Sequence, residues 1–216
     1  MRPTTSTLLL CAGLLLCLSG CGLFGCPDDE KVGDIELDAD TRALIPYQGS
    51  EVLTFQDSLG NTLTLDGQGE EIAQNQLCVR EICTEARIKG ETSCEYVDSE
   101  SRSYSYQSDS AIFQALFYTE LAAPESEQYV DLLRISFSYG VGSVSAFRVI
   151  KERDGSGTYD SLPAGDTLTN VGTLTLGGQV YNDVWTNRYA DFIQLYYTDA
   201  EGLIAFEQRG QLWTRP

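Results

Sequence analysis

The chain has 216 residues, of which 42% are apolar and 10% aromatic, so it can bury a sizeable core and is not disordered throughout. It carries 32 acidic residues against 14 basic ones, a formal net charge of −18. A field of that sign repels phosphate backbones and argues against a nucleic-acid partner. The chain has no histidine, which removes Ser-His-Asp and Cys-His nucleophile systems and imidazole zinc sites. We therefore predict no catalytic activity, no cofactor and no metal of that kind.

The first twenty residues are typical of an export signal. One cation, Arg2, precedes an apolar run from Leu8 to Leu18 that is too short for a membrane helix, which needs about 20 apolar residues. Leu18-Ser19-Gly20-Cys21 resembles a bacterial lipobox, in which the signal is cut before the cysteine and the cysteine carries the lipid. The resemblance implies a signal peptide over residues 1–20 and a membrane anchor at Cys21. Ordinary secretion with an accidental cysteine is the alternative.

Residues 21–42 are expected to form the lipidated N-terminus and a flexible tether. Gly22 stands where an Asp keeps many Gram-negative lipoproteins at the inner membrane, so the resemblance implies the outer membrane. The acidic cluster Asp28-Asp29-Glu30 resembles the surface-export tether of Bacteroidota lipoproteins, although a solvated linker gives the same pattern. Periplasmic and cell-surface facing therefore both stay open.

Residues 43–216 are predicted to form a single all-β domain. Apolar and polar residues alternate with a period of two between turn residues such as Gly60-Asn61 and Gly177-Gly178. The predicted strands include Glu51–Gln56, Thr62–Asp66, Ala111–Ala122, Leu133–Phe137, Thr173–Leu176, Gln179–Trp185, Phe192–Thr198 and Leu203–Glu207. Short strands with frequent turns favour an antiparallel sandwich, meander or open barrel with short hairpins.

The two ends of this domain resemble small Bacteroidota lipoproteins. Pro46 to Phe55 reads Pro-Tyr-x-Gly-x-Glu-x-Leu-x-Phe, and Tyr196 to Phe206 has a Tyr-Tyr pair followed by Gly-Leu-Ile-x-Phe. The likeness leaves the middle of the chain uncovered. The family implies a location and an all-β fold rather than a reaction.

Once Cys21 is lipidated, the mature chain keeps Cys26, Cys78, Cys83 and Cys94. In an oxidising compartment these four predict two disulfides, for which three pairings exist. A turn at Lys89-Gly90-Glu91 would bring the flanks of a hairpin together, so we expect Cys83–Cys94 and, by elimination, Cys26–Cys78.

One loop offers candidate calcium ligands. Asp154, Ser156, Thr158 and Asp160 place oxygens at alternate positions of a Gly-rich segment. The segment lacks the second early acid and the closing Glu of an EF-hand, and a solvated hairpin turn explains the same pattern.

Aromatic residues form two groups along the chain: Tyr104, Tyr106, Tyr118, Tyr129 and Tyr139, then Tyr181, Trp185, Tyr189, Tyr196, Tyr197 and Trp213. Exposed rings beside acids are typical of sugar-binding modules, whereas rings that point inward are core. Two hypotheses follow. The first is a lipid-anchored, non-catalytic envelope protein that binds or scaffolds a glycan or protein partner. The second is a carbohydrate-active module, binding or hydrolytic through paired carboxylates. A cleft with an aromatic floor and two carboxylates would favour the second.

Overall fold

The computed structural model describes residues 26–85, 91–110, 112–125, 128–139, 142–152, 166–187 and 193–216. The strands in these residues are β1 (Glu30–Ile35), β2 (Val52–Asp57), β3 (Thr62–Glu85), β4 (Glu91–Gln107), β5 (Phe113–Glu125), β6 (Gln128–Tyr139), β7 (Gly142–Glu152), β8 (Asp166–Leu176), β9 (Gln179–Asn187), β10 (Ile193–Thr198), β11 (Gly202–Gln208) and β12 (Gln211–Thr214). One helical turn, α2 (Ala39–Arg42), accompanies them. The prediction of an all-β fold is confirmed.

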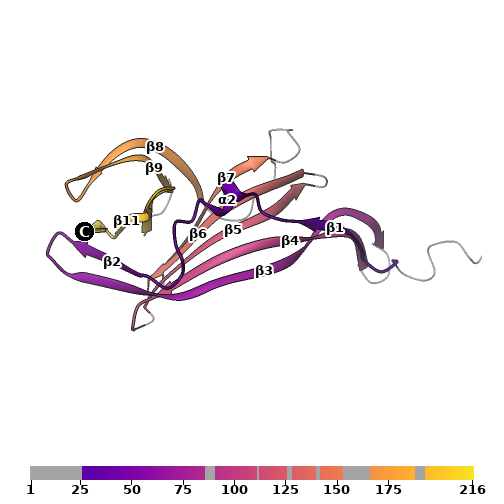
Figure 1. Cartoon of the computed structure of the whole chain (residues 1–216), viewed down its shortest axis with the longest axis horizontal. Helices are drawn as coiled ribbons and strands as arrows, with labels where there is room; N and C mark the ends of the chain where they lie inside the picture. The colour runs from indigo at the N-terminus through magenta and orange to yellow at the C-terminus, as the bar shows by residue number, and fades with distance from the viewer. Residues whose placement is uncertain are drawn as a thin grey trace, which may run out of the picture.

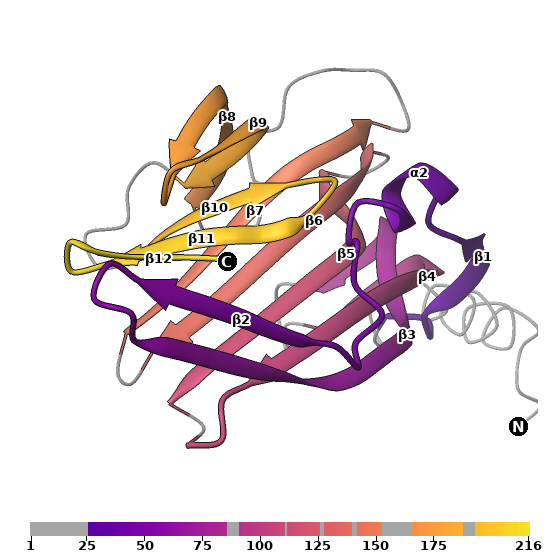
Figure 2. The ribbon, with the colours of Figure 1, turned by 60° about the vertical axis from the view of Figure 1, so that its left-hand side comes forward.

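All the strands belong to one 12-stranded sheet that closes on itself (Figures 1 and 2). From β2 to β12, each strand pairs with the next in the chain, and β12 returns to pair with β2. This order is a meander, one of the three expected arrangements. It is not purely antiparallel, because β7 pairs with β8 and β1 pairs with β4 in parallel.

The predicted hairpins are confirmed. β2 and β3 are joined across Gly60, and β8 and β9 across Gly177 and Gly178, all three with positive φ. The segment around β5 forms a strand, as its alternation indicates. Ala115 and Phe117 are buried in the core, while Leu116 between them lies at the other face.

The interior of the closed sheet is filled by apolar side chains. They include Leu53, Phe55, Tyr106, Phe117, Leu133, Ile135, Phe137, Leu195, Tyr197 and Phe206. A second cluster on β9–β11 contains Tyr181, Val184, Tyr196 and Ile204. β10 and β11 are therefore buried on both faces.

The N-terminal segment differs from the expected tether, because residues 30–35 form β1 and residues 39–42 form α2. β1 pairs with β4 over Glu95–Ser99, and Lys31 Nζ binds the carboxylates of Asp34 and Asp98 at 2.8 and 2.6 Å. At α2, the hydroxyl of Thr41 donates to the buried carboxylate of Asp131 at 2.7 Å. In the acidic run Asp28-Asp29-Glu30, Glu30 pairs with Glu95 and the Asp29 carboxylate accepts a hydrogen bond from the Cys94 N–H, contacts that a reading of local charge misses.

The expected disulfide pairing is wrong. The bonds are Cys26–Cys83 and Cys78–Cys94. β3 and β4 do form the expected hairpin, but Cys83 pairs with Ser93 and lies on the same face of the sheet. Cys94 follows Ser93 on β4, so its side chain points to the opposite face from Cys83.

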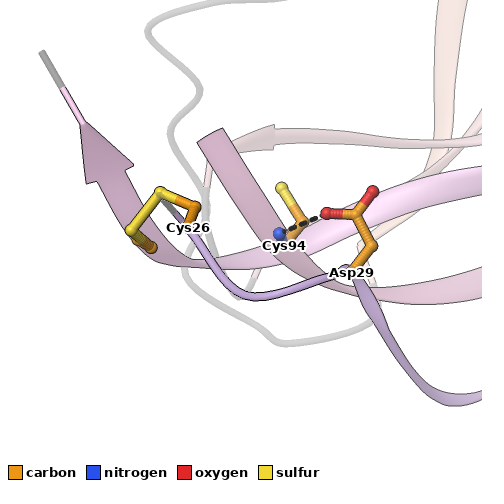
Figure 3. Close-up of a disulfide and its surroundings, with 4 residues drawn as sticks. Cys26, Asp29 and Cys94 are labelled. Atoms are coloured by element: carbon orange, nitrogen blue, oxygen red, sulfur yellow. Dashed lines mark hydrogen bonds between the residues drawn. A yellow bond between two sulfur atoms is a disulfide. The ribbon is translucent and has the colours of Figure 1, made fainter. Parts of the chain in front are cut away.

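Cys78 instead faces Tyr96, two residues from Cys94 and on the same face. Cys83 is then left for Cys26. Figure 3 shows the bond at Cys26 and, beside it, the Asp29 carboxylate accepting a hydrogen bond from the Cys94 backbone N–H at 2.8 Å.

Candidate ligand-binding site

A hollow of about 530 Å³ lies where β9 meets the end of β10 and the β10–β11 loop. Its lining is Asn170, Val180, Tyr181, Asn182, Asp183, Trp185, Thr198, Asp199, Ala200 and Glu201. We call it the Trp185 hollow. It combines two aromatic rings with three carboxyl groups and two side-chain amides.

An irregularity in the β8–β9 pairing shapes one wall of the hollow. The register shifts between Gly172 and Leu174, and opposite this shift Asp183 has a positive φ of 53°. The shift breaks the alternation of β9, so Tyr181 and Val184 both face the core. Asp183 is left exposed at the rim. A non-glycine residue with positive φ is uncommon and is often found at functional sites.

Arg148 holds the ring of Trp185 in place. Its guanidinium carbon lies 4.1 Å from the centroid of the indole, and its Nη2 lies 2.9 Å from the carboxylate of Asp199. The cation and the ring attract each other electrostatically, more strongly where water is excluded, and Arg148 is only 6% exposed. Arg148 itself does not line the hollow. The contact joins β7, β9 and the end of β10.

Hydrogen bonds between side chains and the backbone fix the loop that carries Asp199 and Glu201. The Glu201 N–H donates to the Thr198 hydroxyl at 3.1 Å, and Arg215 Nη1 donates to the Glu201 carbonyl at 2.7 Å. Burial, and then the negative charge of Glu201, raise the pKa of Tyr181 above its ordinary value. Its hydroxyl therefore stays protonated at neutral pH.

This arrangement suits a neutral ligand rich in hydroxyl groups. An aromatic ring packs against the apolar face of a sugar, while carboxylates and amides bind its hydroxyls. The three acids disfavour an anionic ligand.

A second hollow, of about 380 Å³, lies on the sheet over β3–β6. Serine side chains and the Arg134–Glu120 ion pair, at 2.8 Å, form much of its lining. Tyr118 is the aromatic residue that lines it. It offers less apolar ring surface than the Trp185 hollow.

Several predicted site residues lie outside the described part of the chain: the lipidation site Cys21 and the calcium candidates Asp154, Ser156, Thr158 and Asp160. In the described residues, no group of three His, Cys, Asp or Glu side chains could hold a metal ion. The predicted aromatic groups divide between core and surface. Tyr104, Tyr106, Tyr181, Tyr196 and Tyr197 are buried, and Tyr118, Tyr139, Trp185 and Trp213 are partly exposed.

Sequence reasoning recognised Asp199–Gly202 only as a turn and did not single out Arg148. One signal was available for the turn. If β9 and β10 are neighbours, the pairing of Tyr197 with Trp185 brings Asp199 close to the indole. Nothing local indicates Arg148, because its partners lie on other strands.

No protein-family model, curated protein or solved structure matches this chain. No helix in the described ranges is long and apolar enough to cross a membrane. The assignment of a function therefore rests on the residues and their geometry.

Proposed function

We propose that the chain is a lipid-anchored protein of the bacterial outer membrane that binds carbohydrate and has no catalytic role. The lipobox Leu18–Cys21 supports the anchor, and Gly22 supports the outer membrane as its destination. The Trp185 hollow carries the binding role, because it places an aromatic ring among carboxyl and amide groups. This arrangement favours the carbohydrate-binding hypothesis over a purely scaffolding protein with no cleft.

The exposure and the ion pairing of the carboxyl groups in the Trp185 hollow support binding over hydrolysis. A glycosidase needs a general acid, which requires a carboxyl group taken out of water. Asp183 and Glu201 are exposed, and the carboxylate of Asp199 pairs with Arg148. These groups suit acceptance of hydrogen bonds from sugar hydroxyls.

The test is the binding of soluble dextran, mannan, xylan and β-glucan by the native chain and by Trp185→Ala. The variant should bind the recognised polysaccharide at least about tenfold more weakly, a loss of about 1.4 kcal/mol, because the stacking surface is gone. Titration calorimetry measures the affinity. Trp185→Phe keeps a ring and should fall between the two.

Tyr118→Ala is the matched control, since it removes an aromatic side chain from the other hollow. It should bind as the native chain does, and circular dichroism should show all variants folded. Failure of the native chain to bind any of the four polysaccharides, or native affinity in Trp185→Ala, would refute the binding role. Release of reducing sugar would refute its non-catalytic part.

A further inference from the structure

The β3–β4 hairpin extends well beyond the closed part of the sheet. On β4, Ser101 is the residue nearest the hairpin end that pairs with β5, and residues 91–100 continue outward beside β3. β1 occupies the free edge of this extension through Glu95–Ser99. Figure 1 shows β1 and the adjoining parts of β3 and β4 at one end of the molecule. On β3, Gln74 pairs with Glu100, so we call residues 74–85 and 91–100 the arm.

The N-terminal segment is fastened to the far end of the arm. The Cys26–Cys83 disulfide joins them with a Cα–Cα distance of 5.6 Å. The hydrogen bond from the Cys94 N–H to Asp29 and the parallel β1–β4 pairing add two further attachments (Figure 3). From Cys26 onward, the chain therefore cannot swing as a free tether.

The proposed lipid is attached close to this fastening. Only five residue steps separate Cys21 from Cys26, and a fully extended chain spans at most about 3.6 Å per residue. Cys26 can thus lie no more than about 18 Å from the lipidated residue. A lipid at Cys21 brings the end of the arm to the membrane surface.

The Trp185 hollow lies at the opposite end of β3. Ala200 and Glu201 of the hollow also line a cavity with Leu53, and Leu53 pairs with Leu65 near the start of β3. From Leu65 to Cys83 the strand covers about 60 Å along its own path, at about 3.3 Å per residue. Figure 1, drawn with the longest axis horizontal, accordingly shows β8, β9 and β11 far from β1.

We infer that the arm is a disulfide-stapled stalk that holds the Trp185 hollow away from the anchoring membrane. The hollow then meets a free or polymeric carbohydrate on the distal side, rather than a glycolipid head group of the same membrane. The inference rests on the proposed lipidation and binding role, and it adds the class of carbohydrate and the side from which it arrives.

Energy transfer from tryptophan to a dansyl-labelled head group tests the orientation. The lipidated full chain is inserted into phosphatidylethanolamine–phosphatidylglycerol vesicles that carry the labelled lipid. Both native tryptophans lie at the distal end: Trp185 lines the hollow, and Trp213 pairs with Asp57 on β2. Transfer from the native chain should therefore be weak.

Ile82→Trp is the matched control, because Ile82 precedes Cys83 on the arm and is 37% exposed. It should raise the transfer several-fold. Equal transfer from the native chain and from Ile82→Trp would overturn the orientation. A chain that fails to associate with the vesicles would instead refute the proposed anchor.

The carbohydrate class is tested with the same vesicles. The dextran, mannan, xylan or β-glucan that the soluble protein binds should bind the vesicle-anchored protein with the same Kd. A several-fold loss of affinity on anchoring would show that the membrane obstructs the hollow and would overturn the inference. If the soluble protein binds none of the four, the proposed binding role fails before anchoring is tested.

Discussion

Gly202 shows how a single residue ties the start of the domain to its end. It begins β11 with φ +76°, and the next residue, Leu203, donates its N–H to the hydroxyl of Tyr47 at 2.6 Å. A Cβ at Gly202 would overlap the hydroxyl and ring of Tyr47. Tyr47 is buried in the core, so its ring has no room to move aside.

We expect Gly202→Ala to destabilise the fold by at least about 3 kcal/mol, the sum of backbone strain and overpacking. Gly210→Ala is the matched control, since Gly210 has φ +79° and open space around it. It should lose only about 1–2 kcal/mol. Urea unfolding of both variants measures the difference, and equal losses would show that the Tyr47 contact carries no cost.

Because of Glu100, the free energy of unfolding should depend on pH in the acid range. Burial raises the pKa of its carboxyl group, but hydrogen bonds from Arg102, at 2.6 Å, and from Arg42 outweigh it and lower the pKa below the ordinary 4.5. A lowered folded-state pKa gives stability that is complete above pH 4.5 and is lost as the pH falls through the folded value.

Glu100→Gln should therefore cost about 2 kcal/mol at neutral pH, and its deficit should shrink below pH 4.5. Glu36→Gln removes the other carboxylate near Arg42, at a side chain that is 80% exposed, and should cost under about 0.5 kcal/mol. Chemical unfolding at a series of pH values measures both. A Glu100→Gln deficit that stays constant into acid would contradict the assignment.

At the scale of elements, the arm depends on its disulfides more than the closed sheet does. Beyond Ser101 it lacks the support of β5, and its β3 residues have no β2 partner, because β2 pairs with β3 only over Thr62–Asp66. Two-stranded ribbons are marginal by themselves, and β1 adds only a short third strand. The two covalent links compensate for this small local core.

Removal of each bond should have a different cost, because the closed loops differ in length. Cys26–Cys83 spans 57 residues and Cys78–Cys94 spans 16, which corresponds to about 4 and about 3 kcal/mol of loop entropy. Paired Cys→Ser variants, unfolded in guanidinium, should show the larger loss for the first bond. Peptide mapping of the unreduced protein must give these same two links, and a Cys83–Cys94 peptide would contradict the pairing.

At the scale of the whole molecule, the proposed anchor and the strong negative charge act together. A chain of net charge −18 is repelled by an anionic membrane surface, so charge alone would keep it in solution. A lipid at Cys21 would supply the attachment. The arm would then keep the acidic body at a distance from the bilayer.

Cys21→Ala should move the protein from the membrane fraction to the soluble fraction, because no acyl chain can be attached. Fractionation with detergent-phase partitioning measures the shift. Ser19→Ala keeps a small residue in the lipobox and should stay in the membrane fraction. Membrane retention of Cys21→Ala would contradict the proposed anchor.

The sequence by itself determined the fold class and several of the strands, but it did not predict β1, β4 or β7, or β3 beyond Asp66. Strand formation depends on neighbours two residues apart, so the alternation around Phe117 and the glycine turn at Gly177-Gly178 are legible locally. The presence of two disulfides also followed from composition and compartment. Their pairing did not, because the face on which Cys83 and Cys94 lie depends on the register of β3 against β4.

Only the tertiary structure decided how the sheet closes and where a ligand can bind. Closure joins Trp213 to Asp57, and the packing beside the hollow brings together Arg148 of β7, Trp185 of β9 and Asp199 of the β10–β11 loop. Such contacts form when twisted strands return to one another over long stretches of chain, and nothing in the local pattern encodes that return. Likewise, the acidic segment predicted to be a solvated tether is held to the fold because the edge of β4 pairs with β1 and the Cys94 N–H donates to Asp29.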